Sequence, residues 1–144
     1  MATYEATFKS PMSVDEAFSL LADFSNAPVW DANTKTSDLI DGDPFEVGAR
    51  YKVVTGFAGR DLTLTYETIE IDRPNRVVLK SGTGMADIED VMTFEPDGDG
   101  SIVNYQANIL PHGVAKVLDP VFALIFKKVG DRAAESLRDA LKAK

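Results

Sequence analysis

The first residues of the chain alternate between apolar and polar side chains. Over residues 4–8 one parity is apolar and the other polar, which is the period of a strand with one buried face. Ser13 and Glu16 then have the spacing of a capping box, in which each side chain accepts a hydrogen bond from the other residue's backbone N–H. Apolar residues follow at the spacing of one helical face, at Val14, Ala17, Phe18, Leu21 and Ala22. We predict a strand, a short helix and a second helical turn over residues 25–29.

From residue 34 to residue 109 the pattern indicates strands separated by turns. Residues 58–61 form a hairpin between two segments that each bury one face. The apolar residues of these two segments include Tyr51, Val53, Phe57, Leu64 and Tyr66. Beyond them the apolar parity moves to Ile69 and Ile71, which predicts a bulge near residues 67–68 that bends the strand.

Three further turns divide the rest of this region, at residues 74–75, 82–84 and 97–100. The strands between and after them are marked by runs or alternations of apolar residues, among them Val77, Val78, Leu79, Ile88, Met92, Phe94, Val103, Tyr105 and Ile109. Strands joined by short turns pair in antiparallel fashion. The sequence therefore predicts a strongly bent antiparallel meander of about seven strands.

The C-terminal part, from Pro111 onward, is predicted to be helical. Pro120 suits the first turn of a long helix with Asp119 as its cap. One apolar stripe repeats at every fourth residue, at Val121, Ile125, Val129, Ala133, Leu137 and Leu141. A helix over residues 120–141 would be about 33 Å long, enough to lie across the whole sheet. We expect an α+β fold, a single domain over residues 1–144, in which the sheet wraps around this helix.

Phe122 and Phe126 lie about 100° around the predicted helix from that stripe and need another cover. Three covers are open: the short helices of the same chain, the second subunit of a homodimer, or a bilayer surface. Lys127, Lys128 and Arg132 follow directly, and such a cluster is typical of a solvated helix face.

Composition excludes several classes of function. The chain has 144 residues and no cysteine, so disulfides, thiolate metal sites and cysteine nucleophiles are absent. Its 15 Lys and Arg against 23 Asp and Glu give a formal net charge of -8, which would repel a nucleic-acid backbone. The longest apolar run, Val121–Phe126, is far too short to cross a bilayer, and the first residues lack a secretory signal. We expect a cytoplasmic protein with no nucleic-acid partner and no transmembrane segment.

The segment after the first helix resembles a D-F-x-x-x-P-x-W-D stretch of the START-like superfamily called SRPBCC, most closely its polyketide cyclase/dehydrase branch. The residues that carry this likeness are Asp23, Phe24, Pro28, Trp30 and Asp31. Residues 48–51, 67–78 and 94–100 are similar to the start of the family's first long strand and to its two turn signatures. The resemblance implies a helix-grip fold with a deep apolar cavity between sheet and long helix. It implies no single reaction, since members include aromatic polyketide cyclases, lipid and sterol carriers and hormone receptors.

Few residues offer metal or cofactor chemistry. His112 is the single histidine, and without cysteine it cannot build the usual transition-metal site unaided. Residues 97–100 superficially resemble a calcium loop, but flanking strands favour a hairpin. Residues 82–84 lack the third glycine of a dinucleotide fingerprint and precede a strand. We expect neither a metal nor a cofactor.

Asp90 has the inward parity of its apolar neighbours in the strand. A buried carboxylate costs several kcal/mol unless it is paired or protonated, so either Asp90 has a role in a pocket or a bulge turns it outward. Tyr51, Tyr66 and Tyr105 also have inward parities, and a buried tyrosine hydroxyl needs a partner. For these tyrosines, ligand contact and ordinary core packing are both open. Trp30 is expected to form part of the cavity wall.

Two functional hypotheses follow from these residues. The first is the binding, with transport as an extension, of a small hydrophobic or amphipathic ligand such as a lipid, isoprenoid or aromatic polyketide. The second is a polyketide cyclase/dehydrase-type enzyme that uses the same cavity, with Asp90, Tyr66 or Tyr105 as acid or base. The expected ligand-binding residues are Trp30, Tyr51, Val53, Phe57, Leu64, Tyr66, Leu79, Asp90, Met92, Phe94, Tyr105, Val117, Val121 and Ile125.

Overall fold

The computed structural model describes residues 2–57, 59–82, 86–111 and 120–142. The elements follow one another as β1 (Ala2–Ser10), α1 (Val14–Ala22), the short 3-10 helix η1 (Phe24–Asn26), α2 (Ala27–Trp30), β2 (Thr34–Asp41), β3 (Arg50–Phe57), β4 (Arg60–Asp72), β5 (Arg76–Gly82), β6 (Ala86–Asp97), β7 (Gly100–Pro111) and α3 (Pro120–Lys142).

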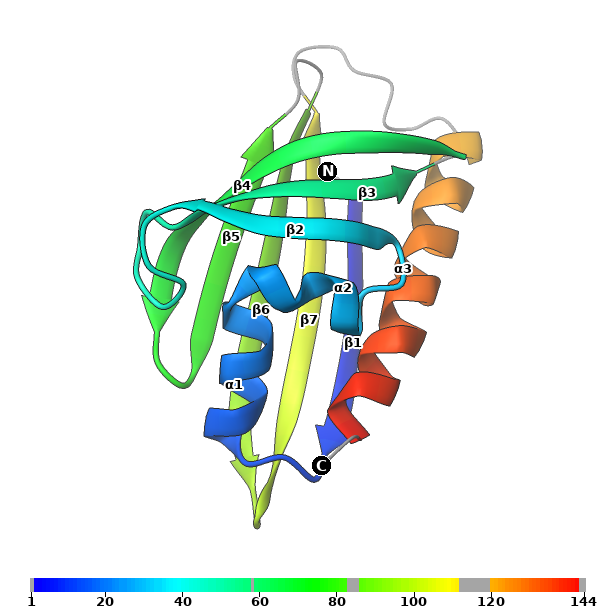
Figure 1. Cartoon of the computed structure of the whole chain (residues 1–144). Helices are drawn as coiled ribbons and strands as arrows, with labels where there is room; N and C mark the ends of the chain where they lie inside the picture. Colours follow the sequence, from blue (N-terminus) through cyan, green and yellow to red (C-terminus); the bar gives the residue numbers. More distant parts are fainter. Residues whose placement is uncertain (1, 58, 83–85, 112–119, 143–144) are drawn as a thin grey trace.

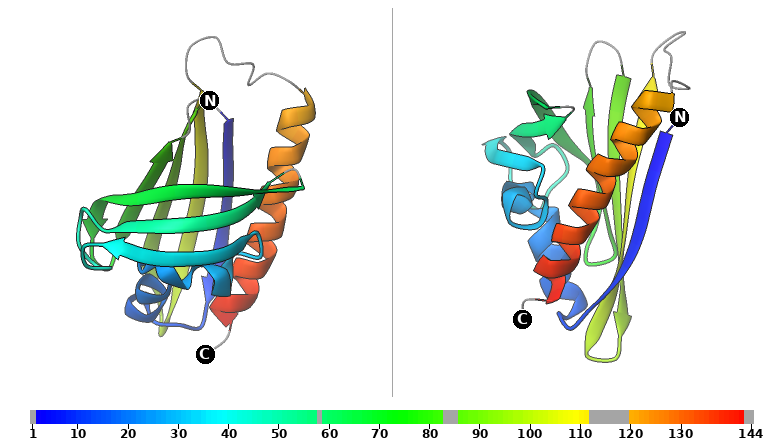
Figure 2. Two further views of the ribbon diagram at one scale, coloured as in Figure 1. Left: turned by 45° about the horizontal axis from the view of Figure 1, so that its top comes forward. Right: turned by 90° about the vertical axis from the view of Figure 1, so that its right-hand side faces the viewer.

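The seven strands form one antiparallel sheet in the order β1-β7-β6-β5-β4-β3-β2. The sheet bends sharply, so that β2, β3 and β4 cross in front of β5, β6, β7 and β1 (Figure 1). On the concave side lie α1, α2 and α3, and α3 packs against β1 and α2 (Figure 2). The predicted bent meander, with two short helices after the first strand and a long C-terminal helix, is confirmed.

The bend in β4 comes from a bulge one residue beyond its predicted place. The register between β4 and β5 shifts between Thr68 and Glu70. Thr68 is completely buried, whereas Ile69 is 41% exposed. The expectation that Ile69 continues the buried parity is therefore wrong, because the extra residue of the bulge turns its side chain outward. Ile71, after the bulge, is half-buried against the core again.

The capping box and the apolar face of α1 close one end of the concave side. Ser13 Oγ accepts from the Glu16 backbone N–H at 3.2 Å, and Glu16 Oε1 accepts from that of Ser13 at 3.2 Å. The buried face of the helix packs inward, and its Phe18 ring meets Phe94 of β6 edge to face at 5.4 Å between centroids. This end of the molecule is filled by side chains of α1, β6 and β7.

The C-terminal half of α3 is the well-packed half. Leu137 and Leu141 are completely buried, and Ser10 of β1 donates a hydrogen bond to the Leu141 carbonyl. Toward the other end, Ile125 and Val129 are half-buried and Leu124 is 56% exposed. The helix is thus fixed to the sheet mainly by its last three turns.

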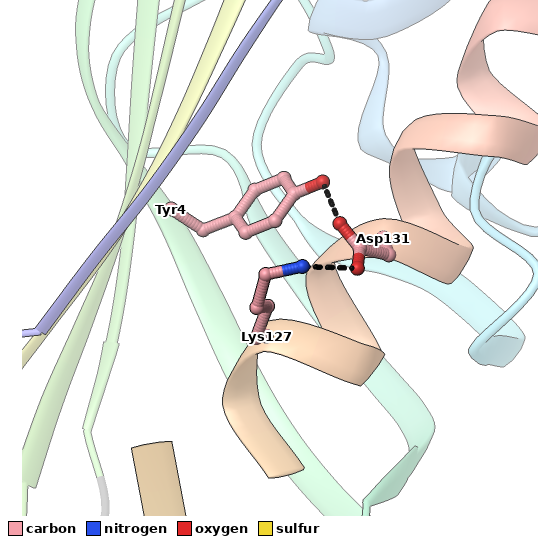
Figure 3. Close-up of polar contacts among 3 residues, drawn as sticks. All are labelled: Tyr4, Lys127 and Asp131. Atoms are coloured by element: carbon pink, nitrogen blue, oxygen red, sulfur yellow. Dashed lines mark hydrogen bonds and ion pairs between the residues drawn. The ribbon is translucent and has the colours of Figure 1, made fainter. Parts of the chain in front are cut away.

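Midway along α3, the Tyr4 side chain joins β1 to the helix (Figure 3). The Tyr4 hydroxyl donates to Asp131 Oδ1 at 2.7 Å, and Lys127 Nζ lies 3.0 Å from Asp131 Oδ2. The Tyr4 ring lies against Gly130, where a Cβ atom would overlap it. Burial and this hydrogen bond raise the pKa of Tyr4 to about 12, and the bond helps to lower the pKa of Asp131.

Pro120 begins α3 as predicted. Several predicted features lie outside the described residues. They are the cap at Asp119, residues 83–84 of the turn that follows Gly82, and the residues Ala58, His112 and Val117. The same holds for the side chains of Phe57, Val121 and Phe122. The homodimer through Phe122 and Phe126 therefore stays a prediction.

Candidate functional site

Asp90 occupies the middle of the concave face. It lies on β6, paired with Leu79 of β5 on one side and Ala107 of β7 on the other, in unbroken register. Its side chain is buried, with 4% exposed. The inward parity of Asp90 is confirmed, and the alternative of a bulge that turns it outward is wrong. The adjacent Glu89 points the other way and accepts a hydrogen bond from Asn108 Nδ2 at 3.1 Å.

Aromatic side chains of two layers meet beside Asp90. Tyr105 of β7 pairs with Met92 of β6, and Ala107, two residues further along β7, pairs with Asp90. Tyr105 is therefore a diagonal neighbour of Asp90, and the side chains of such neighbours reach each other across a sheet. The Trp30 ring of α2 meets Tyr105 edge to face, with 6.1 Å between centroids. The ring of Phe24 in η1 packs against the ring of Tyr66 in β4, with 4.9 Å between centroids. The short helices thus hold aromatic rings against the tyrosines of the sheet.

Burial sets the electrostatics of this cluster. Burial, reinforced by the charge of Asp31, raises the pKa of Asp90 to about 7, although a hydrogen bond from the Tyr105 hydroxyl opposes the rise. Burial and the charge of Asp90 hold the pKa values of Tyr66 and Tyr105 well above their usual range. Near neutral pH, Asp90 is therefore present in both protonated and ionised forms, while both hydroxyls stay neutral.

Asp31 is a second carboxyl near the cluster, at the end of α2. Its oxygens accept from the Asn33 backbone N–H and from the Thr34 hydroxyl, each at 2.9 Å. Burial raises the pKa of Asp31, while these hydrogen bonds and the charge of Arg132 oppose the rise. The residues that follow Trp30 in the chain thus bring a structurally fixed carboxyl close enough to influence Asp90.

Several buried polar atoms lack a hydrogen-bond partner among the described residues: Trp30 Nε1, Thr68 Oγ1, Ser81 Oγ and Ser101 Oγ. Thr68 and Ser81 share the face that carries Tyr66 and Leu79 on β4 and β5. Buried polar groups in proteins are nearly always paired with protein or water. Thr68 therefore offers a hydroxyl without a described partner on the same face of β4 as Tyr66.

Most of the expected ligand-binding residues lie in the core. Those that are buried are Trp30, Tyr51, Val53, Leu64, Tyr66, Leu79, Asp90, Met92, Phe94 and Tyr105. The fold brings Trp30, Tyr66, Asp90 and Tyr105 together. Tyr51, in contrast, donates its hydroxyl to the Pro44 carbonyl at 3.3 Å, and Phe94 packs on α1. A role of these residues in ligand binding stays a prediction.

Sequence reasoning did not single out Thr68, Ser81 or the burial of Asp31. Ser81 keeps the parity of Leu79 in β5, and Thr68 keeps that of Tyr66 in β4. If the alternation of inward and outward side chains is continued along β4 and β5, it predicts that Thr68 and Ser81 point inward although both are polar. The burial of Asp31 depends on how α2 and β2 pack, which no local period encodes.

The described residues offer neither a metal-ion cluster nor a helix suited to spanning a membrane. Across those residues, no three His, Asp or Glu side chains gather to hold a metal ion. None of the helices there is both long and apolar enough to cross a membrane.

A family model described as polyketide cyclase / dehydrase and lipid transport matches residues 1–142. The chain belongs to this family. The resemblance to START-like proteins of the polyketide cyclase/dehydrase branch is thereby confirmed. A comparison with curated protein sequences gave no match.

Solved structures of other proteins share the fold of this polyketide cyclase/dehydrase family member. A START superfamily protein from Mycobacterium smegmatis aligns with a TM-score of 0.77 at 12% identity, over 96% of this chain and 96% of that chain. The Zhui aromatase/cyclase from Streptomyces sp. R1128 aligns with a TM-score of 0.77 at 12% identity, over 97% and 90%. Major latex-like protein 151 from Panax ginseng gives 0.70 at 19% identity, over 94% and 95%. At these identities the likeness establishes the fold, and a ligand or reaction must be argued from this chain's own residues.

Proposed function

We propose that this protein binds one small hydrophobic or amphipathic molecule, such as a lipid, an isoprenoid or an aromatic polyketide, in a cavity between α3 and the concave face. Residues 1–144 would act as one domain. The observation that carries the proposal is the buried Asp90 carboxyl beside Tyr66 and Tyr105, with the Trp30 ring against Tyr105. The family description, which includes lipid transport, supports it.

In such a site, apolar surface supplies most of the binding free energy and polar groups set the orientation of the ligand. Covering a few hundred Å² of apolar ligand surface contributes several kcal/mol at about 25 cal/mol per Å². A few polar groups then orient the ligand. Asp90 and Tyr105 are suited to this because they are buried, polar and already joined by a hydrogen bond, so a ligand hydroxyl could bond to the second oxygen of Asp90.

Trp30 provides the readout that tests the proposal. It is the single tryptophan, it is buried, and its ring meets Tyr105. We expect the neutral fluorophore N-phenylnaphthylamine to quench Trp30 emission in a saturable way, with displacement by long-chain alcohols. Tyr105→Phe should weaken the binding of a long-chain alcohol about threefold to tenfold, through one lost hydrogen bond.

Tyr4→Phe is the matched control, because Tyr4 contacts α3 through Asp131 and is no member of the Asp90 cluster. Tyr4→Phe should leave the affinities for N-phenylnaphthylamine and for the long-chain alcohol unchanged. Absence of saturable quenching, together with no hydrophobic molecule in an organic extract of the purified protein, would contradict the proposal.

A second candidate function is catalysis of cyclisation or dehydration of a polyketide-like substrate in the same cavity. One observation favours it: the pKa of Asp90 near 7 beside the Tyr105 hydroxyl. General acid and base catalysis is most efficient when the pKa of the group lies near the working pH. The cavity would fold the chain, and Asp90 would move the proton.

The enzymatic candidate is tested by turnover of a linear poly-β-ketone. Asp90→Asn should lower turnover by about a hundredfold or more, the usual contribution of a positioned acid or base. Tyr66→Phe and Tyr105→Phe test the two hydroxyls, and Glu95→Gln, an exposed position on the same strand, is the control. No turnover by the unaltered protein would leave ligand binding alone. Turnover that survives Asp90→Asn would remove Asp90 from the mechanism.

A further inference from the structure

A cleft of about 390 Å³ lies beside Ala32 and Asn33, the residues that follow Trp30 and Asp31 in the chain. It opens where the tip of the β3–β4 hairpin approaches α3 (Figure 1). The residues that line it are Ala32, Asn33, Lys35, Gly56, Gly59, Arg60, Asp61, Lys128, Val129 and Arg132. Asp90, Tyr66 and Tyr105 are not among them, so this cleft is separate from the buried cluster.

The cleft is basic in a protein that is strongly acidic. Four of its lining residues are Lys or Arg and one is Asp, whereas the whole chain has a formal net charge of -8. The single carboxylate is already used, because Lys35 Nζ lies 2.6 Å from Asp61 Oδ1. Arg60, Lys128 and Arg132 have no ion pair with a described residue. Arg132 acts on Asp31 only through its field.

These three cations come from two elements that are distant in sequence. Arg60 begins β4, and Lys128 and Arg132 stand one turn apart on α3. Two guanidinium groups and one ammonium around one hollow supply the fork-shaped and point-like donors that bind phosphate oxygens. A solvated helix face, as the sequence predicts, would explain why Lys128 and Arg132 are both on α3. It would not explain why Arg60 of β4 lies at the same cleft.

Two glycines line the cleft, and neither is crowded by other side chains. A Cβ atom added to Gly59 would meet nothing within 4 Å, and one added to Gly56 would meet only the Asn33 carbonyl oxygen at 3.8 Å. Asn33 itself is held in place, because its side-chain Nδ2 donates to the Val129 carbonyl at 2.8 Å. The volume lies within the range of small-molecule sites, about 300–1,000 Å³, and exceeds the needs of a bare phosphate ion.

We propose that this cleft binds the phosphate group of a phosphorylated molecule through Arg60, Lys128 and Arg132. A phosphate monoester carries a charge of about -1.5 to -2 at neutral pH and three acceptor oxygens, which match three unpaired cations. The same chemistry is offered by a free phosphate compound and by the headgroup of a phosphorylated lipid. The inference goes beyond the proposed function, because it needs no occupant in the interior.

The test measures binding of three probes to the full chain by isothermal titration calorimetry at low salt. The probes are inorganic phosphate, monododecyl phosphate below its micelle concentration, and dodecanol. Monododecyl phosphate should lose about tenfold in affinity in Lys128→Gln/Arg132→Gln and about threefold in Arg60→Gln, in keeping with the strength of exposed charge pairs. Raising the salt concentration should weaken binding to the unaltered chain.

Lys9→Gln is the matched control, since Lys9 is exposed on β1 and does not line the cleft. It should leave the affinity unchanged. If inorganic phosphate binds to the same cations about as well as the dodecyl compound, the natural occupant is a free phosphate compound. If only the dodecyl compound binds, the occupant is a lipid headgroup. Either result supports the proposal.

Unchanged affinity in the cleft variants, or an equal loss in Lys9→Gln, would overturn it. Quenching of Trp30 by N-phenylnaphthylamine in the same variants separates this outcome from the proposed interior function. If quenching persists while phosphate binding is absent, the proposed phosphate site is contradicted and the proposed ligand site in the interior is not. All three cleft side chains are exposed, and an unchanged melting temperature would show that the variants remain folded.

Discussion

At the scale of single residues, the central feature is a carboxyl buried where an apolar side chain would be cheaper. Asp90 lies between Leu79 and Ala107 on the neighbouring strands, and burial raises its pKa to about 7. In the unfolded chain an aspartate titrates near about 3.9. The folded state therefore holds more protons than the unfolded state between about pH 4 and pH 7, and stability falls as the pH rises through this window.

Asp90→Asn should remove that dependence. The variant is expected to be more stable than the unaltered chain at pH 8, and the difference should shrink toward pH 5. A rise of about three pKa units sets an upper limit of about 4 kcal/mol on the gain. Urea unfolding at pH 5, 6, 7 and 8 measures it. Asp31 contributes a dependence of the same sign in both proteins, so the difference between them reports Asp90 together with its coupling to Asp31. A variant that is equally destabilised at every pH would contradict the assignment.

Residue-scale patterns predicted the positions of Asp90, Tyr66 and Tyr105 because strand parity is local. They did not predict how far the pKa of Asp90 rises, which depends first on burial and then on the charge of Asp31, from a different element. Ile69 shows a further limit of local patterns. The place of its bulge is fixed by the pairing of β4 with β5, so the alternation alone located it one residue early.

At the scale of elements, α3 is held to β1 by close packing as well as by hydrogen bonds. Gly130 allows the Tyr4 ring to lie directly on the helix. The hydroxyl at the end of that ring reaches Asp131 (Figure 3). The hydrophobic stripe predicted the inner face of α3 but not this contact, because Tyr4 and Gly130 lie at opposite ends of the sequence.

Gly130→Ala should destabilise the protein by about 1–3 kcal/mol, through overlap with the Tyr4 ring. This sign is opposite to the gain of about 1 kcal/mol that alanine gives over glycine in an unobstructed helix. Thermal or urea unfolding measures the change. Asp139→Ala, at an exposed position on the same helix, should stay within about 0.5 kcal/mol. A more stable Gly130→Ala protein would show that the ring does not press on the helix.

The start of α1 offers a second test at this scale. Ser13→Ala removes the acceptor for the Glu16 backbone N–H and should cost about 1 kcal/mol of unfolding free energy. Ser25→Ala is a poor control because that hydroxyl donates to Asp23. Thr63→Ala, an exposed position on β4, is a better one for a general loss of a hydroxyl. An unchanged stability of Ser13→Ala would mean that the cap contributes nothing.

At the scale of the whole molecule, curvature brings together groups that the sequence keeps apart. The fold brings Arg60 to one cleft with Lys128 and Arg132, and it brings Tyr66 near Asp90 on the inner side of the sheet. Periodicity predicted each element, and the family resemblance implied their assembly. Neither predicted the basic cleft, because the hairpin and α3 are far apart in the sequence, with Arg60 and Pro120 separated by 60 residues.

The charge of the molecule is likewise divided by this assembly. The chain has a formal net charge of -8, yet its cleft carries cations without an ion pair among the described residues, and its interior carries Asp90 with a raised pKa and the half-buried Asp31 nearby. An interior of this kind takes up weakly polar ligands best while Asp90 is protonated, since covering an ionised carboxylate with apolar surface costs more than covering a neutral one. N-phenylnaphthylamine should therefore bind more tightly at pH 6 than at pH 8, and Asp90→Asn should abolish the difference. A pH-independent affinity of the unaltered chain would contradict a ligand position near Asp90.

The most direct test of the central claim is a crystal structure of the protein grown with bromododecanol. The account predicts a bromine anomalous peak between α3 and the concave face, with the alcohol oxygen within hydrogen-bonding distance of Asp90 or Tyr105. An interior fully occupied by side chains, with no bromine peak on the concave side, would contradict it.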